Sequence, residues 1–412
     1  MTNPAVSVVV VSRGRPDDLA RCLTGLSQVQ YDPFELIVVA DPEGVRAARS
    51  LTFAEQLKIV PFDEANISAA RNIGIVQAAG EIVAFIDDDA VPEPQWLRYL
   101  VAPATQGDVA ALAGFVRGRN GISFQWKARS LDRYGGFHPL EVHDSQATVL
   151  HPPKGKAVKT EGTNMAFRRS VLVELGGFDS AYHYFLDETD LNMRLARAGY
   201  ATAVVPLAEV HHGFAANAQR RANRVPRDLF EIGASWAVFL RKHVPESERK
   251  GQWKALRAGE KRRLLEHMVT GGLDAGWVRY LMKRLDAGYR DGLARIPGAV
   301  KLPAHPETPF KHFASSSRPS RIVRSRPWRL SRDLAAARER VARGEIVTVI
   351  SLSLTTLYHR IYFDKSGVWV QRGGLFGKSE RHEPIWRVMT RSGRIQNETS
   401  RVMRQRGISK ET

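Results

Sequence analysis

Three consecutive aspartates, Asp87, Asp88 and Asp89, stand directly after the apolar run EIVAFI and shortly before Pro92 and Pro94. Ionised carboxylates at such short range repel one another, so each makes ionisation of the next less favourable. The apolar run predicts a buried strand, which places the triplet at the carboxyl end of a strand. A bound divalent cation would offset the repulsion. The alternative is that the triplet is an exposed acidic loop tip, where solvent screens the repulsion.

Further candidate side chains follow other predicted elements. Asp41 ends the run FELIVVAD, Asp187 and Glu188 precede a predicted helix, and His211 follows the run YATAVVPLAEV. Carboxylates with a histidine suit Mg²⁺ or Mn²⁺, which share their remaining positions with phosphate oxygens. A donor that carries a diphosphate fits such a site, because the ion stabilises charge on the leaving group. Arg71, on a predicted helix, would add a second cation.

Transfer to an acceptor hydroxyl also needs a base, and Asp187 and Glu188 are the candidates. Helix capping is the alternative for these two acids, since the helix dipole favours them in a first turn. The motifs G-x-S-x-G, G-x-x-x-x-G-K-[ST] and G-x-G-x-x-G are absent from the sequence. This argues against a serine hydrolase, a P-loop enzyme and a dinucleotide oxidoreductase.

The elements that must position these side chains alternate in type along the first 110 residues. Strand-like runs and helical stretches interleave, with strands at 7–12, 34–41, 56–62 and 81–87 and helices at 15–28 and 66–80. This order predicts an α/β fold with a mostly parallel, doubly wound sheet. Ligands of such sheets bind beyond the carboxyl ends of the strands, so Asp41 and Asp87 are expected at one edge.

Later segments divide the chain further. A strand at 163–168 and helices at 169–175 and 188–198 complete a catalytic domain of residues 1–214. A basic helical region is expected at 215–318, a linker at 319–344, and a small α/β or partly disordered segment at 345–412.

Charge is distributed unevenly. The net charge is +18, yet residues 1–219 carry −5, residues 220–345 carry +16 and residues 346–412 carry +7. An acidic, metal-using part is therefore followed by a basic part that would face a polyanion. Anionic lipid of the inner membrane leaflet and a merely solvated helical appendage both stay open. Nucleic acid is not expected as a partner, because it would leave the acidic part without a purpose.

Location is indicated by cysteine content and hydropathy. Cys22 is the only cysteine, which favours a reducing cytoplasm. The apolar runs are shorter than the roughly 20 residues of a membrane helix. The N-terminal run SVVVVS lacks a basic lead-in and is typical of a first strand rather than a signal peptide.

Six stretches in order resemble a known family: SVVVVSRGRPDDLARCLTGL, ELIVVAD, NISAARNIGIVQAAGEIVAFIDDDAVPEPQWL, GTNMAFRRSVLVELGGFD, FLDETDLNMRLARAGY and EVHH. Residues 5–214 are similar to the family 2 glycosyltransferases of GT-A fold. The resemblance implies inverting transfer of a sugar from a nucleotide donor, usually UDP-linked, with Mg²⁺ or Mn²⁺. It suits a glycan or lipid-linked acceptor in cell-surface polysaccharide synthesis. A non-catalytic module that binds nucleotide-sugars on the same fold is the alternative.

The resemblance also assigns donor-side residues. Ser12 and Asp41 match the positions that cradle the nucleobase and ribose, and Arg71 matches the arginine of the ARN helix near the donor. The triplet matches the DxD motif. Its middle residue, Asp88, is expected toward the ribose, and Asp87 and Asp89 are expected on the metal.

The later stretches carry the acceptor side. Gly162 and Asn164 match the segment that lines the sugar and the acceptor. His211 matches the family's late histidine, a metal or diphosphate contact, with His212 next to it as the less favoured alternative.

The acidic pair departs from the family pattern. The family usually shows ED where this chain has Asp187 and Glu188 in the reverse order. Alignment gives the base position to Glu188, because Asp190 then keeps its place two residues on, whereas residue type favours Asp187. Glu188 is preferred slightly.

Overall fold

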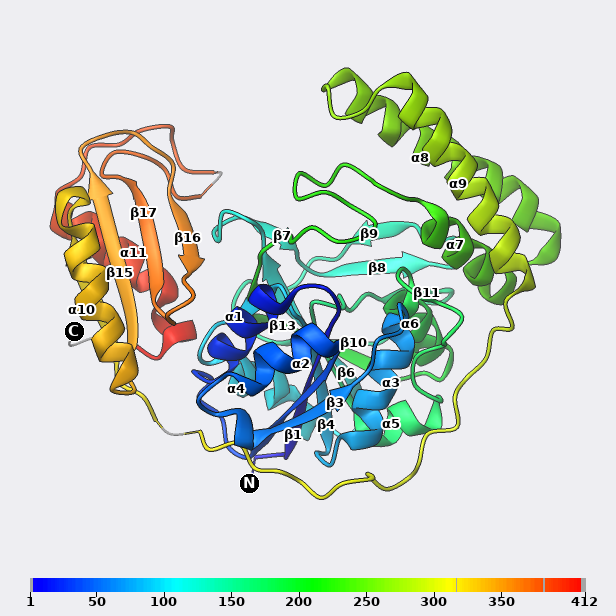
Figure 1. The fold of residues 1–412 in the computed structure, drawn as a ribbon, viewed down its shortest axis with the longest axis horizontal. Coiled ribbons are helices and arrows are strands. Elements are labelled where there is room, and N and C mark those ends of the chain that lie inside the picture. The colour runs from blue at the N-terminus through cyan, green and yellow to red at the C-terminus, as the bar shows by residue number, and fades with distance from the viewer. Residues whose placement is uncertain (1–2, 316, 381, 409–412) are drawn as a thin grey trace.

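The computed structural model describes residues 3–315, 317–380 and 382–408, and its N-terminal domain is built on one mixed sheet (Figure 1). The sheet has ten strands, in the order β10-β13-β6-β12-β4-β1-β2-β3, with β5 beside β13 and β7 beside β6. The strands are β1 (Val6–Ser12), β2 (Phe34–Ala40), β3 (Leu57–Pro61), β4 (Ile82–Asp87), β5 (Ala90–Pro92), β6 (Val109–Arg117), β7 (Phe124–Trp126), β10 (Thr148–Leu150), β12 (Asn164–Arg168) and β13 (Ala201–His212).

The centre of this sheet agrees with the sequence. β1, β2, β3 and β4 are parallel, and the central strands are buried on both faces, as their unbroken apolar runs predict. The sheet is less parallel than expected, because β12 lies antiparallel between β4 and β6. The helices of this domain are α1 (Pro16–Leu26), α2 (Pro42–Arg49), α3 (Ile67–Gln77), α4 (Trp96–Val101), α5 (Arg169–Glu174) and α6 (Asp187–Arg197), with short 3₁₀ turns η1 (Ala54–Gln56) and η2 (Ala102–Thr105).

Two smaller features shape the open edge of the domain. A three-stranded sheet of β8 (Arg129–Asp132), β9 (Phe137–Pro139) and β11 (Lys156–Val158) stands beside the main sheet. Leu186, immediately before α6, is buried with a left-handed φ of 69°. A branched side chain rarely adopts this conformation, so the turn that starts α6 is strained.

The helical region consists of α7 (Phe230–His243), α8 (Glu246–Val269) and α9 (Ala275–Ala294). Trp236 and Phe239 of α7 pack into a buried cluster with Leu131 and Tyr182 of the N-terminal domain. The region is therefore attached through an apolar core rather than suspended on a flexible tether.

The segment predicted as a linker, residues 319–344, is instead part of a folded C-terminal domain. It contains β14 (Ser320–Ser325), η3 (Pro327–Arg329) and α10 (Leu330–Ala342). β14 pairs in parallel with β15 (Ile346–Ser353), and β16 (Arg360–Phe363), β17 (Trp369–Gly374) and α11 (Arg391–Arg406) complete the domain. The connection runs through residues 295–319, where Leu302 and Phe313 are buried against the N-terminal domain.

Glycines allow α7 and α9 to pack at close range, which yields a first testable prediction. A Cβ atom at Gly292 would lie 2.2 Å from the carbonyl oxygen of Ala234. We expect Gly292→Ala to lower the free energy of unfolding by about 1–3 kcal/mol through overpacking. Gly259→Ala in α8 is the control, because nothing lies within 4 Å of that Cβ position. It should raise stability by about 0.5–1 kcal/mol, measured by urea unfolding. Equal effects at both sites would contradict the close packing.

Candidate active site

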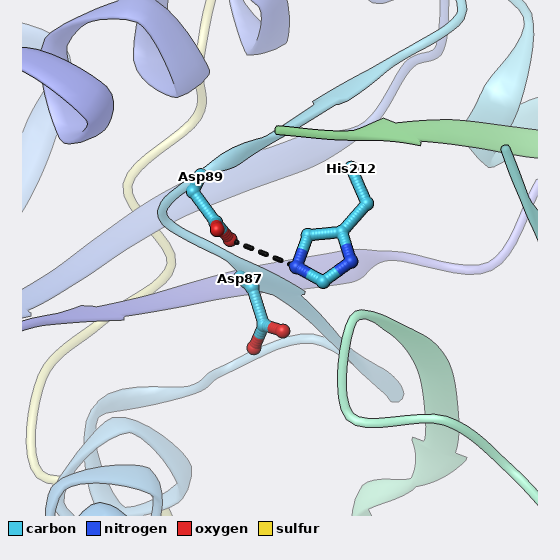
Figure 2. Close-up of side chains that lie close together, drawn as sticks. All are labelled: Asp87, Asp89 and His212. Atoms are coloured by element: carbon cyan, nitrogen blue, oxygen red, sulfur yellow. Dashed lines mark ion pairs between the residues drawn. The ribbon is translucent and has the colours of Figure 1, made fainter. Parts of the chain in front are cut away.

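Asp87, Asp89 and His212 converge at the end of β4 (Figure 2). β4 ends at Asp87, and the chain turns into β5, which pairs antiparallel with the end of β13 so that His212 lies opposite Ala90. One ligand atom from each of the three side chains lies within 4.8 Å of the others. The His212 Nε2 atom is 3.3 Å from the Asp89 Oδ1 atom. Two carboxylates and an imidazole therefore face one point.

The imidazole of His212 is oriented for metal binding. Its Nδ1 atom is 2.9 Å from the Gln125 Oε1 atom, and an amide oxygen can only accept a hydrogen bond. Nδ1 therefore carries a proton, and Nε2 is the ring nitrogen that faces the aspartates. Nε2 is buried and lies beside the Asp89 carboxylate. A histidine fixed from behind in this way fits a divalent cation.

The structure does not bring His211, the histidine preferred from the sequence, to this cluster. Successive side chains of a strand point to opposite faces, so His211 and His212 diverge. The His211 Nε2 atom lies 2.8 Å from the Glu93 Oε1 atom, and its ring packs against Trp369 at 4.9 Å. The alternative, His212, takes the place beside the aspartates.

Asp88 points toward Ser12 and Arg15. The Ser12 hydroxyl donates to its Oδ2 atom at 2.7 Å, and the Arg15 Nη2 atom is 2.5 Å from its Oδ1 atom. Burial raises the pKa of Asp88 to about 7, against the lowering effect of Arg15. Burial also acts on Asp89, but contacts with His212 and Arg15 outweigh it and lower the pKa of Asp89 below its usual value. Asp89 is thus ionised and available as a ligand.

Arg71 connects the aspartate triplet to the acidic pair. It is 3% exposed, its Nη1 atom donates to Asp187, and its Nη2 atom lies 3.5 Å from the Asp87 Oδ1 atom. The Thr163 hydroxyl donates to the Asp87 Oδ2 atom at 2.6 Å. The two acidic groups, far apart in the sequence, therefore belong to one site.

Asp187 and Glu188 occupy the first turn of α6 but differ in environment. Burial raises the pKa of Asp187 to about 7, although Arg71 opposes this. The Lys159 Nζ atom donates to the Glu188 Oε1 atom at 2.6 Å. Burial acts to raise the pKa of Glu188 as well, but the charge and hydrogen bond of Lys159 help to lower this pKa to about 2. The side chain of Asp187 is 2% exposed and that of Glu188 is 19% exposed. Glu188 is therefore the ionised and accessible carboxylate.

Two adjoining cavities open at this edge of the sheet. The wider, of about 330 Å³, is lined by both acidic groups and by basic side chains: Arg15, Arg71, Asp87, Asp89, Arg129, Lys159, Asp187, Glu188, Arg220 and Arg224. The narrower, of about 190 Å³, lies over the ends of β1 to β3 and is lined by Val11, Ser12, Val39, Phe62, Asn66 and Ile67, among others. They share Arg15, Ile67, Tyr184 and Asn217, so one extended ligand could occupy both.

The other predicted residues lie in varied positions. Ser12 lines the narrower cavity and Gly162 the wider one, where a Cβ atom at Gly162 would lie 2.7 Å from the Arg71 Nη2 atom. Asp41 caps α2, and its oxygens accept from the backbone amides of Gly44 and Gly14, each at 2.9 Å.

Asn164 serves the sheet rather than the cavity. Fully buried, it donates to the carbonyls of Phe115 and Ala208, at 2.9 and 2.8 Å, and accepts from the Trp96 indole at 2.8 Å.

Sequence reasoning missed most of the basic lining. Arg15 stands three residues after the end of the first strand in SRGRP, a signal that could have identified it. Arg129 and Lys159 come from the ends of strands in the three-stranded sheet and carry no comparable motif. Arg220 and Arg224 lie beyond residue 214, so the site extends past the expected boundary of the catalytic domain.

Comparison with known proteins identifies the family. The model described as Glycosyltransferase like family 2 matches residues 4–230, more than half of the chain. The chain belongs to the family 2 glycosyltransferases. Together with the mixed sheet, this confirms the fold class expected from the sequence, a GT-A domain followed by a helical region and a small C-terminal sheet.

Curated relatives of this glycosyltransferase cover the same part of the chain. Glycosyltransferase AglE of Haloferax volcanii is 28% identical over 184 residues, which is 43% of this chain and 57% of the relative. Glucosyl-dolichyl phosphate glucuronosyltransferase of the same organism is 30% identical over 187 residues, which is 42% of this chain and 56% of the relative. The chain thus spans little more than half the length of these relatives.

Solved structures show weaker likeness to this glycosyltransferase. Mannosyltransferase PcManGT from Pyrobaculum calidifontis, in complex with GDP-Man and Mn²⁺, has 18% identity and a TM-score of 0.42, covering 71% of this chain and 88% of that one. S. aureus TarS 1–349 in complex with UDP-GlcNAc has 14% identity and a TM-score of 0.43, covering 70% and 79%. Within the described residues of this glycosyltransferase, each helix is too short or too polar to cross a bilayer.

Mn²⁺ binding tests the cluster of Asp87, Asp89 and His212. We expect His212→Ala to weaken Mn²⁺ binding at least about tenfold, because the change removes the nitrogen that faces both aspartates. Isothermal titration calorimetry of the purified chain measures the affinity. His151→Ala is the control, since the His151 side chain is 68% exposed and belongs neither to the cluster nor to the cavity lining. Unchanged binding in His212→Ala would contradict this assignment.

Proposed function

We propose that this enzyme transfers a sugar, with inversion, from a nucleoside diphosphate donor that is UDP-linked to a hydroxyl of a glycan or lipid-linked acceptor. One observation carries the proposal: Asp87 and Asp89, which meet His212 in one cluster, line the same cavity as the acidic pair of α6. Arginines and lysine from several elements surround it, which suits an anionic ligand that binds in the presence of a cation.

The two cavities suit the two parts of such a donor. Val11, Val39 and Phe62 give the narrower cavity apolar walls that suit a nucleobase. Arg15 stands where the cavities meet, so it would contact the diphosphate that connects the nucleoside to the sugar. The sugar and the acceptor would then occupy the wider cavity, whose volume is in the range of small-molecule sites.

Asp87, Asp89 and His212 would hold Mg²⁺ or Mn²⁺, because carboxylates and a neutral imidazole suit these ions. When bound, the ion offsets the negative charge that develops on the departing diphosphate. Asp88 is fully buried and binds Ser12 and Arg15, which line the narrower cavity. Asp88 would thus act on the nucleoside side of the donor by holding these two side chains in place.

Glu188 would act as the general base. Its carboxylate is ionised and reaches the cavity, whereas Asp187 is bound to Arg71 and more deeply buried. In the transfer step, Glu188 accepts the proton of the acceptor hydroxyl as its oxygen forms a bond to the anomeric carbon. The bond from that carbon to the diphosphate breaks on the opposite face, and the nucleoside diphosphate leaves with the bonding electrons. Asp187 would hold Arg71 in place.

The acceptor proposal is a glycan or lipid-linked sugar in cell-surface polysaccharide synthesis, made at the inner face of the cytoplasmic membrane. One relative is named a glucosyl-dolichyl phosphate glucuronosyltransferase, which supports a lipid-linked acceptor. The +16 charge of residues 220–345 and the +7 of residues 346–412 suit an anionic lipid surface.

Exposed apolar side chains support this membrane contact. Six residues of the loops after β15 and β17 are between 58% and 80% exposed: Leu354, Leu357, Tyr358, Ile385, Trp386 and Val388. The loops adjoin, because the Gly374 amide donates to the Leu357 carbonyl at 2.9 Å and the Phe376 amide donates to the Thr355 carbonyl at 3.1 Å. These loops and the turn between α8 and α9 lie along the upper edge of the molecule (Figure 1). Exposed aromatic and aliphatic side chains suit the interface of an anionic bilayer.

Turnover of Glu188→Gln tests the catalytic assignment and the rival binding module. We expect kcat to fall at least about 100-fold, because the amide cannot accept the proton, with donor affinity changed less than about twofold. Nucleotide release with a panel of nucleotide-sugars measures the rate, and calorimetry measures donor binding. Full activity in Glu188→Gln, with activity lost in Asp187→Asn, would move the base to Asp187. Donor binding without turnover in the unmodified enzyme would favour the non-catalytic module.

Vesicle sedimentation tests the membrane contact. We expect binding to phosphatidylglycerol-containing vesicles but not to pure phosphatidylcholine, and weaker binding as salt rises. Leu357→Glu/Trp386→Glu should reduce the bound fraction severalfold. Ile296→Glu is the matched control, since Ile296 is 92% exposed but lies on the connecting segment. Equal binding by both variants would contradict the contact. If the wild type and Ile296→Glu were dimers and the double variant were a monomer, the surface would be assigned to self-association instead.

A further inference from the structure

The two chain segments that carry Asp89 and His212 continue into the surface that contacts the C-terminal domain. β5 carries the chain from Asp89 to Glu93, and β13 places His211 immediately before His212. Glu93 is 1% exposed and His211 is 8% exposed. Neither side chain lines the cavities, so the transfer step described above leaves both without a role.

Arg406, at the end of α11, binds the Glu93 carboxylate, which also contacts His211. Its Nε and Nη2 atoms donate to the Oε2 and Oε1 atoms of Glu93, each at 2.9 Å, and its Nη1 atom donates to the Thr348 hydroxyl at 2.9 Å. The guanidinium lies 4.2 Å from the ring centre of Trp369, and His211 contacts the same carboxylate of Glu93. Arg406 itself is fully buried.

Further contacts join the same surfaces. Val91 of β5 belongs to a buried cluster with Ile346, Ile361, Phe363 and Trp369 of the C-terminal domain.

Polar contacts run alongside this cluster. The Gln95 amide donates to the Gln405 carbonyl at 2.8 Å, and the Gln405 side chain donates to the Glu209 Oε1 atom at 3.2 Å. The end of α11 therefore touches the chain just after β5 and within β13, directly behind the cluster.

We propose that Glu93 and Arg406 are positioning residues, through which the C-terminal domain holds Asp89 and His212 in place for the metal. Apolar residues could join two domains at least as tightly as a buried ion pair, whose desolvation is costly. A bidentate guanidinium–carboxylate pair adds a fixed orientation, and lysine cannot reproduce it. That orientation is what a site of three side chains on two different strands requires. The proposal rests on the metal site of the proposed function.

Two variants separate positioning from stability. Arg406→Met leaves the Glu93 carboxylate buried and uncompensated, so it lowers stability as well. Glu93→Gln/Arg406→Met removes both charges and should regain much of the lost melting temperature, but it does not restore the bidentate contact. Arg257→Met/Asp286→Asn is the control, because that pair between α8 and α9 is also bidentate, at 2.7 and 2.9 Å.

Two readouts are needed, Mn²⁺ affinity by calorimetry and backbone hydrogen–deuterium exchange of residues 87–93 and 210–215. We expect both Arg406 variants to exchange faster in these segments and to bind Mn²⁺ about tenfold or more weakly, as loss of an outer partner of a metal site does. The control pair should change neither readout.

Wild-type exchange and Mn²⁺ affinity in the double variant would overturn the proposal, because a role in stability alone predicts that recovery. Unchanged exchange in Arg406→Met would overturn it as well. If the wild type binds no Mn²⁺ while Arg406→Met still accelerates exchange, the positioning role stands and the proposed metal site fails.

Discussion

Negative charge at the carboxyl end of β4 is the constraint on which the site depends. Five carboxylates gather there, and their mutual repulsion would keep most of them from being ionised without cations nearby. They are Asp87, Asp88, Asp89, Asp187 and Glu188. Basic side chains from separate elements approach three of them closely, with Arg15 on Asp88, Arg71 on Asp187 and Lys159 on Glu188. For Asp87 and Asp89 the arginine nitrogens are 3.5 Å away. These two aspartates, with the His212 nitrogen that faces them, therefore keep the capacity to bind a divalent cation.

The sequence was sufficient for the parallel strands and for the acidic groups. Apolar runs define β1, β2 and β4, and the carboxyl ends of parallel strands must share an edge, so the triplet was placed correctly. It was not sufficient to choose between His211 and His212. That choice depends on which face of β13 each side chain occupies, and the register with β5 decides it. Lys159 was missed for a related reason, because it follows a short strand whose pairing partner lies about 25 residues away.

The C-terminal domain was the larger error. Residues 319–344 were predicted as a linker from the stretch PSRIVRSRPWRL, which holds arginines in Ser320–Ser325. β14 is an edge strand, paired on one side only, and an edge strand tolerates such charges. The domain that β14 completes contacts Glu93, just after β5, through Arg406 and Glu209 of β13 through Gln405, so residues from the far end of the chain lie behind the candidate metal site. Polar residues buried at a domain interface carry no periodic signal, and only the folded chain shows that Glu93 and Arg406 meet.

Anomalous diffraction at the manganese edge, from crystals of the full chain grown with Mn²⁺ and UDP, tests the central claim most directly. The account predicts one strong peak in the wider cavity, bound by Asp89 and His212 with Asp87 beside it, and a diphosphate that extends from the ion toward Arg15. A fully occupied nucleotide without a peak between these side chains, or a peak on His211 instead, would contradict it.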